Sequence, residues 1–214
     1  MKKNGVEMVF ILDRSGSMSG LETDTIGGFN TMIDKQKALP GEAIVSTVLF
    51  DHEFKVLHQR LPLAAIKPMT THDYEVRGST ALLDAIGRSI EKINRVHQSL
   101  SEETRPQQTV FVITTDGMEN ASRSYSYDAI RHMVAHQKEA HGWEFIFLGA
   151  NIDAIMTASR FGIDASRAAN YHADKAGVKV QYDSLHEAIS SLRKNNSIDA
   201  NWKTTLDKDF IKRK

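Results

Sequence analysis

The chain of 214 residues has no cysteine, no net charge and no long apolar run. Without cysteine it has neither a disulfide framework nor a thiolate metal site. Lys plus Arg and Asp plus Glu number 27 each, so no bulk field attracts nucleic acid or an anionic membrane. The apolar run at residues 6–12 is interrupted by Glu7 and is too short for a signal peptide or a membrane span. We therefore expect a cytoplasmic protein that binds neither nucleic acid nor membranes.

Several motifs of nucleotide binding and catalysis are also missing. The loop after residue 12 has neither a G-x-G-x-x-G nor a Walker pattern, which argues against a nucleotide-binding protein. No G-x-S-x-G occurs, which argues against a Ser-His-Asp hydrolase. His132 and His136 stand four positions apart, a spacing that can hold a metal on a helix, but no H-E-x-x-H surrounds them. We interpret these two histidines as surface residues.

The composition is that of an ordinary soluble domain, with 41% hydrophobic and 25% charged residues. The length fits one domain, or one domain with an extension. We place the domain at residues 1–195 and a polar C-terminal extension at 196–214. Within the extension, Trp202, Leu206 and Phe210 at a spacing of four fit a short docking helix, and a disordered tail is the alternative.

Apolar, β-branched runs alternate with amphipathic segments along the chain. Strands are predicted at residues 6–12, 43–50, 53–58, 109–115, 143–148 and, as a short sixth, 168–171. Helices are predicted at residues 25–36, 80–100, 126–140, 154–160 and 183–194, with a loop at 61–77 and a capping start for the second helix at 78–80. A helix between the first two strands makes them parallel, whereas the two-residue link 51–52 allows only a hairpin. The third strand is therefore antiparallel at the edge of an α/β fold, a Rossmann-like, doubly wound, mostly parallel sheet with helices on both faces.

The two strands at the predicted switch point of this sheet each end on a carboxylate. With strand order 3-2-1-4-5, ligands bind between the first and fourth strands, whose last residues are Asp13 and Asp116. Two bare carboxylates about 4 Å apart repel by roughly 4 kcal/mol at an effective dielectric near 20. Either one carboxyl is protonated, or a cation lies between them, or they stay further apart.

Three hydroxyls are predicted at the same edge. Ser15 and Ser17 follow Asp13 on a tight loop, and Thr80 begins a helix whose positive end faces this edge. Taken alone, Asp-x-Ser-x-Ser also fits side chains that stabilise a turn. Three segments that bring two carboxylates and three hydroxyls together favour a site for a hard cation such as Mg²⁺.

These residues fall into three motifs, Asp13-x-Ser15-x-Ser17, Gly78-Ser79-Thr80 and Thr115-Asp116-Gly117. The pattern resembles the metal-ion-dependent adhesion site of von Willebrand factor type A domains, and the resemblance covers roughly residues 5–195. It implies a sixth strand beside the fifth, giving the order 3-2-1-4-5-6. It also implies that a Glu or Asp of a partner protein completes the shell of the metal. The ligands of Mg²⁺ or Mn²⁺ that it implies are Asp13, Ser15, Ser17, Thr80 and Asp116.

Without a secretion signal or disulfides, the chain resembles the intracellular, stand-alone prokaryotic members of that family. Such members often act as adaptors for ATPases or in stress-response and assembly systems, and we expect a partner of this kind. Met18, Glu75, Arg77 and Met118 flank the predicted ligands. We expect these four residues to form the rim that contacts the partner, although a purely solvated role also fits loop residues.

The alternative function is a phosphatase or phosphotransferase of the haloacid dehalogenase type, which also has an Asp at the end of its first strand. That chemistry places a second Asp two residues further on, where this chain has Ser15, and serine is no general acid or base near neutral pH. The lysine that such enzymes usually have near the aspartate of the fourth strand is also missing near Asp116. We therefore expect a protein-interaction module that is not an enzyme.

Overall fold

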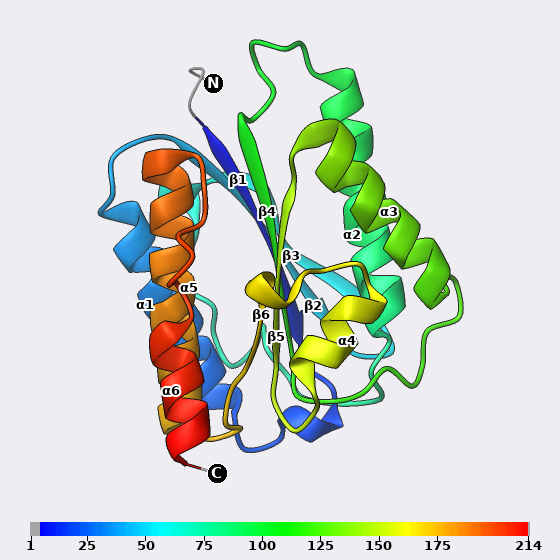
Figure 1. Ribbon diagram of the computed structural model, residues 1–214, viewed down its shortest axis with the longest axis vertical. Helices are drawn as coiled ribbons and strands as arrows, with labels where there is room; N and C mark the ends of the chain where they lie inside the picture. Colours follow the sequence, from blue (N-terminus) through cyan, green and yellow to red (C-terminus); the bar gives the residue numbers. More distant parts are fainter. Residues whose placement is uncertain (1–4, 214) are drawn as a thin grey trace.

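The computed structural model describes residues 5–213 and contains a six-stranded sheet (Figure 1). The strand order is β3-β2-β1-β4-β5-β6, and every neighbouring pair is parallel except β2 with β3. The predicted fold class, strand order and antiparallel edge strand are confirmed. The strands are β1 (Val6–Asp13), β2 (Ala43–Phe50), β3 (Phe54–Pro62), β4 (Gln108–Thr115), β5 (Glu144–Gly149) and β6 (Ala168–Asn170).

Two layers of helices cover the sheet (Figure 1). One layer consists of α1 (Glu22–Lys37), α5 (Lys175–Asn195) and α6 (Thr204–Lys212). The other consists of α2 (Leu82–Ser99), α3 (Tyr127–His141) and α4 (Ala154–Arg160). Short 3-10 helices lie at η1 (Gly16–Met18), η2 (Leu63–Ala65) and η3 (Ala165–Arg167). None of the helices within residues 5–213 combines the length and the apolar character needed to cross a membrane.

The central strand β1 is buried on both faces. Met8, Phe10 and Leu12 join the core that includes α1 and α5, while Val9 and Ile11 join the core that includes α2 and α3. Successive side chains of a strand point to opposite faces, so an unbroken apolar run needs helices on both sides of the sheet. Since β1 pairs with β4 in parallel, the carboxyl ends of these two strands lie together. That edge of the sheet carries the predicted site.

The segment after residue 195 packs onto the domain. Of the two alternatives predicted for it, the structure contains the helix, α6, which contacts α5 and β6. Trp202 and Leu206 are buried in the core beside α5, and Trp202 Nε1 donates to the Ser166 carbonyl oxygen at 2.9 Å. Lys203 Nζ donates to the Ala168 carbonyl oxygen at 2.7 Å. The segment therefore lies along β6, the short edge strand.

Helix α5 is longer at its start than the sequence predicts. It begins at Lys175, two turns before the predicted start at residue 183. The Asp174 side chain caps it by accepting a hydrogen bond from Gly177 N at 2.8 Å. A Cβ at Gly177 would lie 2.1 Å from the His172 carbonyl oxygen, so the tight entry to this helix requires glycine.

Candidate functional site

Asp13, the last residue of β1, is held by donors on both of its carboxylate oxygens. Ser15 N donates to Oδ1 at 2.7 Å, and Thr115 Oγ1, at the end of β4, donates to Oδ2. The Tyr74 hydroxyl donates to the Asp13 carbonyl oxygen. The side chain is 1% exposed. The parallel pairing of β1 with β4 therefore fixes this carboxylate from both strand ends.

A chain of polar contacts joins the other four predicted ligands. Thr80 Oγ1 donates to Ser15 Oγ at 2.9 Å, and Ser15 Oγ lies 3.2 Å from Ser17 Oγ. Ser17 Oγ donates to Asp116 Oδ1 at 2.5 Å. Gly117 lies against the same group, since a Cβ there would be 3.0 Å from Ser17 Oγ. The fold thus brings all the predicted ligand residues together from three separate segments.

The hydrogen bonds to the two carboxyl groups of the site do not fully offset the effect of burial on their pKa values. Burial raises the pKa of Asp13 to about 6, although hydrogen bonds from Thr115 and Ser15 oppose the shift. Burial also raises the pKa of Asp116, against the hydrogen bond from Ser17. Asp116 Oδ2 is buried and has no hydrogen-bond partner. A buried acceptor without a partner costs about 1–3 kcal/mol, a cost that a cation bound at this oxygen would offset.

The donor set suits a hard divalent cation. Carboxylate and hydroxyl oxygens are the ligands that Mg²⁺ and Mn²⁺ prefer. In the described part of the chain, no group of three or more His, Asp or Glu side chains is arranged to hold a metal ion. A metal at this edge would therefore need Ser15, Ser17 and Thr80 in addition to the two aspartates.

Thr80 reaches the site through a tight turn that precedes α2. Gly78 has φ of +69°, and a Cβ there would lie 2.0 Å from His52 Nδ1. Gly16 N donates to the Gly78 carbonyl oxygen at 3.0 Å, which joins this turn to the Ser15 loop. Only glycine has both the conformational freedom and the small size that position 78 needs.

The loop after β4 contributes residues that the sequence analysis missed. The predicted cap of α2 at residues 78–80 is wrong, because Glu119 Oε2 instead accepts a hydrogen bond from Leu83 N at 2.9 Å. Asn120 Oδ1 accepts from Thr80 N at 2.9 Å, and Asn120 N donates to the Thr80 carbonyl oxygen at 3.0 Å. These partners lie about forty positions away in the sequence, and the polar pair Glu119-Asn120, which follows Met118, is a local signal for them.

The predicted rim is only partly exposed. Glu75 is exposed and Met118 is 74% exposed, so both are accessible to a partner. Met18 is instead buried in the core beside α1, because the 3-10 turn of η1 directs it inward. The prediction that Met18 contacts a partner is therefore wrong. Arg77 is half-exposed, but it pairs with Asp51 and Glu53.

The hydroxyl groups of the site have no imidazole partner in the described part of the chain. Within residues 5–213, no histidine hydrogen-bonds to Ser15, Ser17 or Thr80, whose hydroxyls bond to one another and to Asp116. Covalent catalysis by a hydroxyl normally needs an adjacent general base. His132 and His136 are exposed on α3.

Comparison with known proteins yields structural matches only. No family model and no curated protein matches the sequence. The fold is similar to that of a von Willebrand factor type A protein from Catenulispora acidiphila, with TM-score 0.58 and 15% identity over 86% of this chain and 42% of that one. It is also similar to proximal thread matrix protein 1 of the mussel byssus, with TM-score 0.58 and 12% identity over 85% of this chain and 45% of that one.

A third match is the manganese-loaded TRAP protein of Plasmodium vivax, with TM-score 0.54 and 13% identity over 84% of this chain and 72% of that one. The chain spans less than half the length of the mussel and Catenulispora proteins. At these identities the matches establish the fold and leave the activity open.

Proposed function

Starting from the von Willebrand factor type A fold of this chain, we propose that it is a divalent-metal-dependent protein-interaction module. One Mg²⁺ or Mn²⁺ binds at Asp13, Ser15, Ser17, Thr80 and Asp116. The bound metal then holds a Glu or Asp side chain of a partner protein. An ATPase or a component of a stress-response or assembly complex is the kind of partner we expect.

The observation that carries the proposal is the chain of oxygen contacts that ends at Asp116. It consists of three hydroxyls and the Asp116 carboxylate, whose buried Oδ2 has no hydrogen-bond partner. The Asp13 carboxylate is bonded to the same loop through Ser15 N. A cation would compensate both buried carboxylates and give that oxygen a partner. One protein of the same fold, the Plasmodium vivax TRAP protein, is manganese-loaded, which supports a metal of this class.

The role in binding a partner follows from the number of ligands and their exposure. Mg²⁺ requires six ligands in near-octahedral geometry and keeps water where the protein provides none. Gly16 and Ser17 are exposed, whereas Asp13, Ser15 and Thr80 are buried. A sixth ligand therefore has access from the side of Ser17. The two carboxylates from this chain balance the charge of the metal, so a third carboxylate would bind by replacing a water at the open coordination position.

The proposal includes the absence of catalytic turnover. The phosphatase alternative needs a general acid or base two residues after Asp13, and the Ser15 hydroxyl there is engaged by Thr80 and Ser17. Metal-dependent phosphatase activity that disappears in Asp13→Asn would revive that alternative.

The test is Mn²⁺ binding measured by calorimetry, followed by partner capture with and without chelator. Thr80→Ala should weaken Mn²⁺ binding and abolish chelator-sensitive capture. Thr109→Ala, a buried threonine at the opposite end of β4, is the matched control and should leave both unchanged. Wild-type protein that binds no Mn²⁺, or that captures the same partners in chelator, would contradict the proposal.

A further inference from the structure

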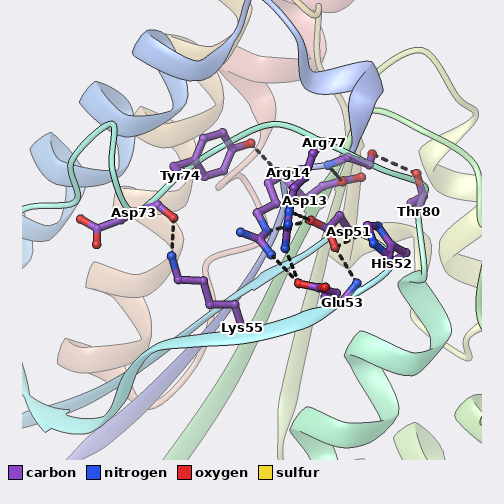
Figure 2. Close-up of polar contacts among 11 residues, drawn as sticks. Asp13, Arg14, Asp51, His52, Glu53, Lys55, Asp73, Tyr74, Arg77 and Thr80 are labelled. Carbon is purple, nitrogen blue, oxygen red and sulfur yellow. Dashed lines mark hydrogen bonds and ion pairs between the residues drawn. The ribbon is translucent and has the colours of Figure 1, made fainter.

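A cluster of charged residues lies beside the candidate metal site, at the end of β2 (Figure 2). Its centre is Asp51, which directly follows β2 and is fully buried. Arg14, Arg77, His52 and Glu53 surround the Asp51 carboxylate, as Figure 2 shows. None of the proposed metal ligands belongs to this cluster.

Asp51 pairs with two arginines through the same oxygen. Arg14 Nε and Arg77 Nε each lie 3.1 Å from Asp51 Oδ2. The other oxygen, Oδ1, accepts a hydrogen bond from Glu53 N at 2.5 Å. Arg77 also pairs with the Glu53 carboxylate. The two arginines are therefore held together by one shared carboxylate.

The buried arginine depends on this carboxylate for its charge. Arg14 is 3% exposed, and its Nε and Nη2 atoms have no aligned hydrogen-bond acceptor. Asp51 at 3.1 Å and the more distant Glu53 at 3.9 Å provide its counter-charge. Without Asp51, a buried guanidinium would lose its close ion-pair partner, which is strongly unfavourable.

The two arginines belong to two of the segments that carry the proposed ligands. Arg14 lies between Asp13 and Ser15, and Arg77 lies three residues before Thr80. Main-chain hydrogen bonds join the same segments. Arg77 N donates to the Arg14 carbonyl oxygen at 2.9 Å.

Asp51 takes part in this main-chain network as well. Ala81 N, next to Thr80, donates to the Asp51 carbonyl oxygen at 2.9 Å. Gly16 N closes the network by donating to the Gly78 carbonyl oxygen. Asp51 therefore contacts the Ser15 segment through its carboxylate and the Thr80 segment through its carboxylate and its main chain.

We propose that Asp51 is a positioning residue of the metal site, which acts through Arg14 and Arg77 to fix the Ser15 and Thr80 hydroxyls relative to each other. This inference rests on the proposed metal binding. It also changes the role of Arg77 from partner contact to support of the Thr80 loop. Through these contacts of Asp51, a change at the β2–β3 hairpin would alter the metal site.

The test separates the arrangement of the loops from metal binding. Hydrogen exchange in chelator at the amides of Gly16, Arg77 and Ala81 reports whether the two segments stay joined. Mn²⁺ affinity from calorimetry reports whether the ligands stay in place. Both are measured for wild type, Asp51→Asn and Arg77→Ala, the second of which changes a half-exposed side chain and is expected to fold.

Arg167→Ala is the matched control. It removes a similar pair, Arg167 Nε with Glu144 Oε2 at 2.9 Å, from the amino end of β5. This variant should not change Mn²⁺ affinity or the exchange of the three amides.

In Asp51→Asn and Arg77→Ala we expect faster exchange at the three amides and Mn²⁺ affinity lower by about tenfold or more, the usual cost of losing support for a metal ligand. Arg77→Lys, which keeps the charge, should recover part of the affinity. Unchanged hydrogen exchange in both variants, or wild-type Mn²⁺ affinity despite faster exchange, overturns the positioning role of Asp51 but not the proposed metal binding. Wild-type protein that binds no Mn²⁺ overturns the proposed function and with it any role of Asp51 at a metal.

Discussion

At the scale of single residues, the Thr115 hydroxyl favours the ionised form of the Asp13 carboxyl group. Its hydrogen bond to Oδ2 lowers the pKa of Asp13 and opposes the effect of burial. A carboxylate must be deprotonated to bind a metal. Thr115 is not itself a proposed ligand, but its hydrogen bond helps keep the proposed ligand Asp13 in the ionised form that binds a metal.

We predict that Thr115→Val weakens Mn²⁺ binding by about tenfold, because Asp13 loses a donor that favours its anionic form. Calorimetry at neutral pH measures the effect. Thr114→Val is the control, since the neighbouring buried Thr114 accepts a hydrogen bond from Gln181, whereas Thr115 donates to Asp13. Equal Mn²⁺ affinity of Thr115→Val and wild type would show that the Thr115 hydroxyl is dispensable.

We also predict that Gly78→Ala destabilises the protein by more than about 1 kcal/mol, since the methyl group requires a strained φ and meets His52. Gly27→Ala is the control, because Gly27 lies in α1 with nothing within 4 Å of a built Cβ. That change should stabilise by about 0.5–1 kcal/mol. Denaturant unfolding compares the two variants, and similar midpoints for both would contradict the prediction.

At the scale of elements, an ion cluster at the amino end of β1 joins three of them. Glu7 of β1 is fully buried and accepts hydrogen bonds from Arg60 of β3 at 2.7 and 3.0 Å. His97 Nε2 of α2 lies 2.8 Å from Glu7 Oε2. Burial opposes the ionisation of Glu7, but hydrogen bonds from His97 and Arg60 outweigh it and hold the pKa below its usual value.

This direction of the pKa fixes the pH dependence. A carboxyl with a lowered pKa in the folded state adds stability above its unfolded pKa and loses it as the pH falls through the folded value. We predict that Glu7→Gln removes this contribution and costs about 3 kcal/mol at neutral pH, since it leaves Arg60 without its partner. Urea unfolding between neutral and acidic pH should show a flatter acid limb in Glu7→Gln than in wild type. Unfolding free energies that fall equally with decreasing pH in the two proteins would refute this prediction.

The elements differ in how well their sequence predicts them. The strands β1, β2 and β4 are continuous apolar runs, so local pattern and the link lengths were enough to order them. The first turns of α5 were missed, because Gly177 and two valines make residues 175–182 a poor local helix. β3 runs four residues beyond its predicted end, to Pro62, past Arg60 at φ of +48° and the register shifts near it.

The same distinction applies to the site. The proximity of Asp13 and Asp116 was predictable, because Asp13 ends β1, Asp116 directly follows β4, and strand order alone brings those strand ends together. The residues that hold the loops of the site in place were not predictable. Asp51, Glu119 and Asn120 act on residues some 25 to 40 positions away. No local pattern encodes such contacts, which depend on how the loops pack in three dimensions.

At the scale of the whole molecule, the segment after residue 195 completes the fold. It covers the β6 edge and part of the core beside α5. An uncovered strand edge invites pairing with another chain.

We predict that Trp202→Ala destabilises the protein by about 3–5 kcal/mol, since it empties a buried site and removes the hydrogen bond to Ser166. Ile211→Ala is the control on the same segment. Because Ile211 is 70% exposed, that change should stay within about 0.5 kcal/mol. Thermal unfolding measures both, and a Trp202→Ala midpoint equal to that of Ile211→Ala would show that the segment is not part of the cooperative unit.

The central position of β1 also has a consequence for the order in which the protein is made. β1 leaves the ribosome before both of its neighbours and can pair with β2 while β4 is still unmade. Ser17 and Asp116, which touch in the finished site, lie 99 positions apart in the chain. Until β4 inserts, one edge of β1 stays open and the proposed ligand set lacks Asp116. The nascent chain therefore gains the last of the proposed ligands in the same step that closes the middle of its sheet.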